Sequence, residues 1–328
     1  MVFADTLLVF MLGLQFGQYR MMIDNSLRVF SGQMQVQASG YHDEPHMHRS
    51  IAAADKLAQA IRDNTRLDAV STRGYGFALV SSETRTLGAQ ISGVDPRHEP
   101  RVSTIPGLIK QGRYLEGTDS NEIVVGSILA RNLRIEPGDE LTILGSGRDG
   151  SIAATVTPVV GVFESGSRDM DRHMLSMPLD TFRDVFSMGD HAHSIVIGGE
   201  RDQSERIAAR ASTALQDRDA LQLLDWETLM PGLKQAIQAD FTSAWFMYAV
   251  LIVLVAFGML NTMLMSVLER THEFGLLLAL GVQHGKLGRM IITESALLAL
   301  IGMLLGMLAG GLVIWYFLVN GFSYPGME

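Results

Sequence analysis

Cysteine is absent from the 328 residues of this chain. The absence excludes disulfide bridges, thiolate nucleophiles, and zinc or iron–sulfur sites that use cysteine ligands. It is compatible with an oxidising compartment, where few proteins keep free thiols.

Positive charge is also scarce, with 26 Lys and Arg against 35 Asp and Glu, a net charge of −9. No run of basic residues forms a patch, which argues against nucleic acid as a partner, because phosphate recognition needs clustered Lys and Arg. No P-loop, HExxH or nucleophile-elbow spacing is present. We therefore expect a non-catalytic protein without a cofactor.

Charge of either sign is rare at the two ends of the chain. From Phe241 onward there are only four acidic and three basic residues, and residues 1–17 carry only Asp5. Apolar residues make up 47% of the whole chain, and they concentrate in these ends. A charged middle thus lies between two apolar ends, which indicates a polytopic membrane protein.

Two apolar runs are long enough to cross a bilayer, 244–267 and 290–319. The connector 268–289 between them holds all three basic residues of the region, so the positive-inside rule places it in the cytoplasm. The charged middle then lies outside the cytoplasm. Residues 1–17 are too short for a complete span and lack the basic start of a signal peptide, so we expect the outer part of a first membrane helix.

The charged middle, 18–240, predicts an α+β domain inserted between the membrane helices. Short apolar runs predict strands, and longer amphipathic runs such as 50–63 and 204–215 predict helices. Both flanks are helical: 17–31 has an apolar face, and Pro231 suits a first helical position that leads into the span at Ala244 without a breaker. We expect both membrane helices to extend out of the bilayer as stalks.

Three sequence motifs indicate a known family. Leu268 to Gly281 resembles the signature of FtsX-like permeases, in which the second membrane helix ends in E-R-x-x-E-[IF]-G-x-x-[RK]-A-x-G. Glu294, followed by glycines at four-residue intervals, resembles the third helix of that family. The stretch Glu122 to Gly126, with Pro137-Gly138-Asp139 further on, resembles the MacB-like periplasmic domain of lipoprotein-release permeases.

This resemblance implies the permease subunit of an ABC transporter in a bacterial inner membrane, with 241–328 as its membrane core. It implies a cytoplasmic ATPase subunit, a second permease copy or paralogue, and a periplasmic or lipoprotein partner. The cargo in such families is often lipoprotein, peptide or drug handled on the outer side. The family has a basic residue where this chain has Leu278, and it has four membrane helices, so we expect this chain to be truncated at both ends.

The connector is the predicted coupling segment to the ATPase. We expect Glu269 and Glu273 one turn apart on one helix face, and an apolar face formed by Phe274, Leu277, Leu278 and Gly281. An interfacial helix on lipid headgroups is the alternative. The residues assigned to coupling are Glu269, Arg270, Glu273, Phe274, Gly275, Leu277 and Gly281.

Gly302, Gly306 and Gly310 repeat every four residues, which allows another helix to approach closely. That helix belongs to a second permease or to this chain, and the two options are compatible. Glu294 lies about one turn inside the third span, where an ionisable group suggests a functional role. We expect it to extend to the cytoplasmic interface or to pair with Arg289 rather than to relay protons.

Two groups of polar residues suggest further chemistry, although no metal site is assigned. The first combines histidine and carboxylate as a zinc or copper site would, but it reads as a solvated loop. The second has no motif of an active site around it. The members are His42, Asp43, Glu44, His46 and His48 in the first, and Asp169, Asp171, His173, His191 and His193 in the second.

Two alternative functions remain open from the sequence. A signalling receptor would place a sensor domain between two membrane helices, but it needs a long cytoplasmic transmitter where 268–289 leads directly to a third span. A division-type regulator of cell-wall hydrolases would use the same mechanics with a much smaller outer domain.

Overall fold

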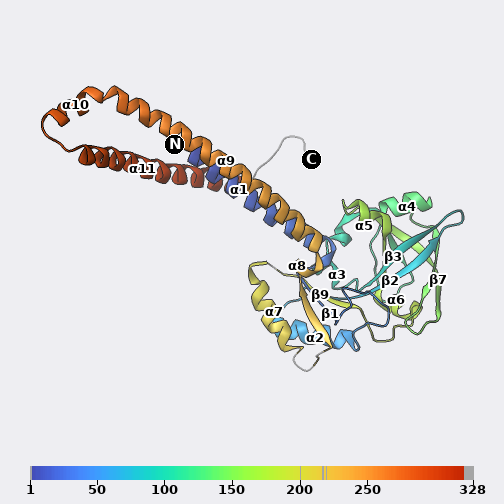
Figure 1. Ribbon diagram of the computed structural model, residues 1–328. Helices are drawn as coiled ribbons and strands as arrows, with labels where there is room; N and C mark the ends of the chain where they lie inside the picture. The colour runs from blue at the N-terminus through green and yellow to red at the C-terminus, as the bar shows by residue number, and fades with distance from the viewer. Residues whose placement is uncertain (1, 200, 216–217, 219, 321–328) are drawn as a thin grey trace. The chain divides into compact units, whose positions relative to one another are not determined.

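The computed structural model describes residues 2–199, 201–215, 218 and 220–320. The chain divides into two compact units, residues 1–22 with 232–328, and residues 23–231. We call them the membrane unit and the soluble unit (Figure 1).

Helices α1 (Val2–Ser26), α9 (Pro231–Glu269), α10 (Thr271–Ala279) and α11 (His284–Asn320) are the main elements of the membrane unit. Among the described residues, three helical segments are long and apolar enough to cross a bilayer: Val2–Ser31, Pro231–Glu269 and His284–Asn320. Helix α9 begins at Pro231, as predicted, because the fixed φ of proline suits a first helical turn. Stalk and span form one helix of 39 residues.

A closed barrel of six strands forms the larger part of the soluble unit. Its strands follow the order β2, β3, β8, β5, β7, β6, and β6 pairs back with β2. The bounds are β2 Val70–Ser81, β3 Thr86–Val94, β5 Ile123–Gly126, β6 Glu140–Ser146, β7 Ile152–Phe163 and β8 Met174–Pro178. The edge strand β4 (Ile109–Gly112) pairs with β7.

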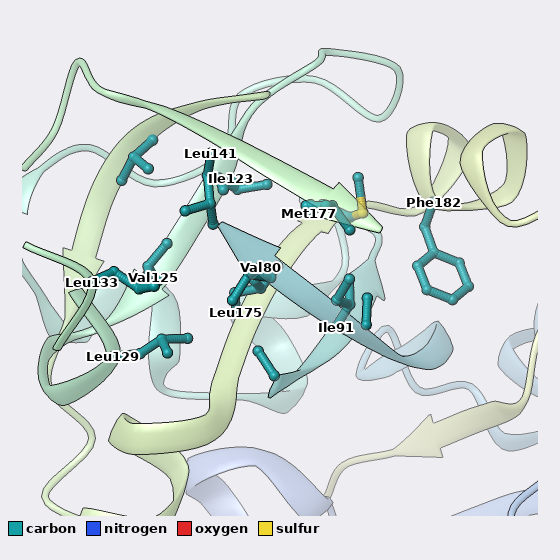
Figure 2. Close-up of a cluster of buried hydrophobic side chains, with 14 of the residues drawn as sticks. Val80, Ile91, Ile123, Val125, Leu129, Leu133, Leu141, Leu175, Met177 and Phe182 are labelled. Carbon is teal, nitrogen blue, oxygen red and sulfur yellow. The ribbon is translucent and has the colours of Figure 1, made fainter. Parts of the chain in front are cut away.

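Side chains alternate between the two faces of each strand, and the apolar ones that point inward fill the barrel. Val80, Ile91, Leu141 and Leu175 are fully buried and point into one core, which Figure 2 shows. Helices α4 (Ser127–Leu133) and α6 (Leu179–Val185) contribute to this core. The ring of Phe182 lies where a Cβ of Gly74 or Gly93 would be, only 2.3–2.5 Å from its atoms, so these strands need glycine there.

A second, smaller core lies beside the barrel. Strand β2 is long enough to serve both, since its first half pairs with β9 (Ser194–Ile197) and its second half with β6. Beyond β9 the sheet continues with β1 (Met34–Ala38) and β10 (Leu221–Asp225), both antiparallel. Helices α2 (Ala54–Thr65) and α7 (Ser204–Thr213) pack their apolar faces into this second core.

The remaining helical segments are short. They are η1 (Leu27–Ser31), which continues α1, α3 (Glu99–Val102), η2 (Ile105–Leu108), α5 (Arg168–His173), η3 (Arg201–Gln203) and α8 (Trp226–Leu229). The predicted α+β domain between membrane helices is confirmed. The chain enters the soluble unit through η1 and β1 and leaves it through β10 and α8, so both connections use neighbouring strands.

Candidate functional site

The connector between α9 and α11 folds as a short separate helix. Helix α9 ends at Glu269, Arg270 leaves the helical path, and α10 begins at Thr271. The hydroxyl of Thr271 donates to the carbonyl of Leu268, which competes with the regular helical bond. The expectation of one helix face carrying Glu269 and Glu273 is therefore wrong, because these carboxylates belong to two successive helices.

Helix α10 presents an apolar, exposed surface in this structure. Leu276 is 58% and Leu280 is 75% exposed, while Phe274 and Leu277 are half-buried. Gly281 ends the segment with φ +90°, and its N–H donates to the carbonyl of Leu278. This left-handed conformation favours glycine, which explains the last residue of the motif.

Arg270 joins the connector to α11. Its guanidinium lies 3.6 Å from the Glu273 carboxylate and 3.2 Å from that of Glu294. The expected partner of Glu294, Arg289, is wrong, since a separation of five residues turns the two side chains to different helix faces. Arg270 and Glu294 are each about half exposed, and both line a cavity of about 760 Å³ between α9 and α11.

Two glycines of α11, Gly306 and Gly310, face α1. Gly302, Gly306 and Gly310 are buried. A Cβ on Gly306 would lie 2.5 Å from the Cβ of Asp5, and one on Gly310 would lie 2.8 Å from the Cβ of Val9. Glycine thus allows two helices of the same chain to pack at close range, and a contact with a second permease stays a prediction.

A cluster of polar side chains joins α1 to α9. Its members are Gln15, Tyr19, Asp240 and Tyr248. The hydroxyl of Tyr19 donates to Asp240 at 2.5 Å, and that of Tyr248 donates to Gln15 at 2.6 Å. The amide of Gln15 donates to Tyr19 at 2.6 Å. The sequence did not indicate this cluster, because its members lie more than 200 positions apart.

The other end of the first helix is held inside the soluble unit. Five successive carbonyls at its C-terminus accept hydrogen bonds, so none of these groups is left unsatisfied as helix ends otherwise are. The pairs are Leu27 with the Gly32 N–H, Arg28 with the Thr104 N–H, Val29 with the Ser103 hydroxyl, Phe30 with the Arg73 guanidinium, and Ser31 with the Gln35 amide.

Arg73 is the centre of this arrangement. It is fully buried, donates to both carboxylate oxygens of Glu99 at 2.6 and 3.2 Å, and lies 4.0 Å above the ring of Phe30. Burial alone would lower the pKa of Arg73, but the Glu99 carboxylate raises it above its usual value, so the guanidinium stays charged. A cation at a helix C-terminus also complements the helix dipole.

The two polar groups singled out in the sequence do not converge. Among the described residues, no three of His, Cys, Asp and Glu lie close enough to hold a metal ion. Glu44 pairs instead with Arg49 at 2.9 Å. His193 is fully buried, accepts from the Tyr75 N–H, and stacks on Tyr41. Burial lowers the pKa of His193 to about 4, so it serves as a neutral core residue.

Asp171 is likewise buried and accepts two hydrogen bonds from Ser165, which leaves it a structural role. Asp169 pairs with His173 at 3.3 Å on the surface of α5. His191 contacts the Ser50 hydroxyl at 3.0 Å.

Comparison with known proteins matches both units. Residues 6–218 match the MacB-like periplasmic core domain, and residues 245–327 match the C-terminal region of FtsX-like permeases. The lipoprotein-releasing system transmembrane protein LolC of Xylella fastidiosa (strain Temecula1) is 23% identical over 73% of this chain and 58% of its own length. The macrolide export ATP-binding/permease protein MacB of Escherichia coli is 26% identical over 81% of this chain and 41% of its own length.

The chain thus spans 58% or less of the length of these two relatives. Among solved structures, the periplasmic region of MacB from Actinobacillus actinomycetemcomitans aligns with a TM-score of 0.46 and 14% identity, covering 63% of this chain and 94% of that one. Because the family match covers more than half of the sequence, the chain belongs to the FtsX-like permeases that carry a MacB-like periplasmic core domain.

Proposed function

We propose that this chain is the permease subunit of an ABC transporter in a bacterial inner membrane, with the soluble unit on the outer side. Cytoplasmic ATPase subunits would bind α10, and their ATP-driven movement would reach the soluble unit through the membrane helices. The cargo is lipoprotein, peptide or another envelope molecule, handled on the outer side. A second permease copy or paralogue and a periplasmic or lipoprotein partner would complete the assembly.

The observation that carries this proposal is the exposed apolar surface of α10 between two long membrane helices. Leu276 and Leu280 would be covered by a groove on a soluble partner, as helix-in-groove recognition requires. The ion pair of Arg270 with Glu294 would transmit a force on α10 to α11 as well as to α9.

A second observation supports transmission as the mechanism. The two connections into the soluble unit use the adjacent strands β1 and β10. A relative shift of α1 and α9 would therefore act on one antiparallel pair at the edge of the sheet. Three candidate spans with a short connector also favour a permease over a receptor, which needs a long cytoplasmic transmitter.

The proposal is tested by replacing Glu273 with lysine in the full-length permease, co-purified with its ATPase. Losing a charge-assisted contact and adding repulsion should cost about 2–5 kcal/mol of binding if the contact is buried. Membrane insertion should be unaffected, because a lysine on the cytoplasmic side agrees with the positive-inside rule. We expect an inserted permease that no longer retains or stimulates its ATPase.

Two matched variants separate docking from other effects. Glu273→Gln also removes the pair with Arg270 but adds no repulsion, so it should weaken retention less. Glu205→Lys makes the same charge change at an exposed site of the soluble unit and should leave ATP turnover at the wild-type value. Equal ATPase retention and turnover for wild type and Glu273→Lys would remove the coupling role from α10.

A further inference from the structure

The outer face of the barrel carries large apolar side chains in the open. Phe77 and Leu79 on β2 are 70% and 51% exposed, and Leu144 on β6 is 47% exposed. Leu79 and Leu144 lie directly opposite each other in the ladder, so these side chains form one patch. Contiguous exposed apolar surface of this kind usually marks a binding site.

Two hollows adjoin this patch and share residues. A hollow of about 560 Å³ is lined by Leu79, Leu144 and three residues of β3, Gly88, Ala89 and Gln90. A second, of about 260 Å³, is lined by residues from η1, β1 and the loop after β1. Phe77 and Gln90 line both hollows, so the two hollows meet at these side chains, and we call them together the groove.

The smaller hollow is polar but uncharged. The Gln37 amide donates to Gln35 at 2.8 Å, and the Gln35 amide donates to the Ser31 carbonyl at 2.8 Å. Gln37 is only 4% exposed, and its Oε1 is buried without a hydrogen-bond partner among the described residues. A buried acceptor left unsatisfied costs free energy, so a donor from a ligand would stabilise it.

The charges around the groove limit the ligand further. Among the described residues, no lysine or arginine lines either hollow. Asp169 and His173, which lie 3.3 Å apart, line the larger hollow, and His42 lines the smaller one. An ionised carboxylate or phosphate would meet the Gln37 carbonyl oxygen without a cation to neutralise it, which is unfavourable.

We propose that this groove binds an uncharged amphiphile. Its apolar chain lies over Phe77, Leu79 and Leu144, and an N–H or O–H of its head group donates to Oε1 of Gln37. Ser31 and Leu229 also line the smaller hollow, so the head group contacts both connections between the soluble unit and the membrane helices. The inference goes beyond ATPase coupling, because the binding needs neither α10 nor ATP.

The test uses two photoactivatable probes that differ at one group. N-hexadecanoyl glycinamide has an uncharged head, N-hexadecanoyl glycine has a carboxylate, and each carries a diazirine in its chain. The full chain in lipid nanodiscs is irradiated with either probe in the absence of ATPase, and mass spectrometry locates the labelled residues. We expect the glycinamide to label 70–94 and 140–146, and an excess of the unreactive glycinamide to suppress this labelling.

Three variants assign the two ends of the groove. Phe77→Asp should abolish labelling of 70–94. Gln37→Met should lower glycinamide labelling by about fivefold, the effect of one lost hydrogen bond, and should remove the preference over the carboxylate probe. Ile152→Asp makes a similar change at a side chain that is 80% exposed but lines neither hollow, and it should leave labelling unchanged.

Each contrary result overturns a stated part of the inference. Labelling confined to α1, α9 and α11, or labelling that persists in Phe77→Asp, would show that the groove holds no chain. Equal labelling by the two probes in the wild type, or no effect of Gln37→Met, would show that Gln37 does not receive the head group. Circular dichroism of each variant confirms that its fold is retained.

Discussion

Each of the two units contains an arginine–glutamate pair, and the two pairs differ in their exposure to solvent. Arg73 and Glu99 in the soluble unit are 0% and 2% exposed, whereas Arg270 and Glu294 in the membrane unit are 47% and 49% exposed. A buried pair resists separation, because each lone charge would be left without water, whereas an exposed pair exchanges partners at little cost. The first pair suits a fixed joint, a contact that keeps its geometry. The second suits a movable joint, a contact that can change partners.

The largest expected effect is at the buried pair. Arg73→Met leaves the buried Glu99 carboxylate without its cation and the Phe30 carbonyl without the donor from Arg73, so we expect a loss of about 3–5 kcal/mol in the stability of the soluble unit. Chemical denaturation of the full chain in nanodiscs measures this loss. Arg101→Met removes an exposed pair with Asp68 and should cost under about 1 kcal/mol. Equal losses for the two variants would contradict a fixed joint.

A buried histidine, His193, should make the stability of the soluble unit depend on pH. The pKa of His193 is about 4 in the fold and about 6.5 when unfolded, so the unfolded chain binds the proton more readily. The contribution of neutral His193 to the free energy of unfolding is therefore fully present above pH 6.5. It falls as the pH drops towards 4, by up to about 3 kcal/mol. Denaturation across this range measures the slope.

Replacing His193 with glutamine should remove most of this pH dependence. The exposed His272 of the connector provides the control, since His272→Gln should leave the slope unchanged. A slope that persists in His193→Gln would assign the dependence to other groups.

The glycine contact of the membrane unit should show an intermediate effect. Gly306→Leu places a side chain where the Cβ of Asp5 already lies, and overpacking costs about 1–3 kcal/mol. A chemical cross-link between Phe10→Cys and Phe317→Cys, whose native rings have centroids 5.7 Å apart, reports whether α1 and α11 are in contact. We expect its yield to fall in Gly306→Leu. Gly311→Leu faces open space in the described structure and should preserve the yield.

The exposed pair should show the smallest effect on stability. Glu294→Gln removes one charge of a half-exposed pair, which is worth about 0–1 kcal/mol. The variant should unfold as the wild type does, yet it should lower ATPase stimulation if the pair links α10 to α11. A stability loss as large as that of Arg73→Met would show that the two pairs do not differ as proposed.

Much of the fold was predictable because local patterns determine it. Apolar run lengths indicated the spans, Pro231 marked the start of α9, and the amphipathic runs 50–63 and 204–215 indicated α2 and α7. Strands β4, β8 and β10 were not predicted. They are only four or five residues long, and β8 is buried on both faces, so its residues show no alternation.

The candidate site was predictable only where it is contiguous. The motif from Glu269 to Gly281 lies in one stretch, and Gly281 meets a conformational need that its own residue type satisfies. The partner of Glu294 was predicted wrongly, because distance along the chain favoured Arg289 while the fold brings Arg270 to it. The groove at Gln37 was not predicted, since β1, β2 and β3 only meet through the sheet.

The sequence by itself determined where the helices run and that a charged α+β domain separates them, because hydrophobic length and periodicity are local properties. Only the tertiary structure decided that Arg73 donates to the Phe30 carbonyl at the end of the first helix while it pairs with Glu99, which lies 26 residues from Arg73 in the chain. It also decided that Gly306 and Gly310 of α11 lie against α1. Such contacts depend on the relative positions of segments that are distant in the sequence. Strand pairing and side-chain packing fix these positions.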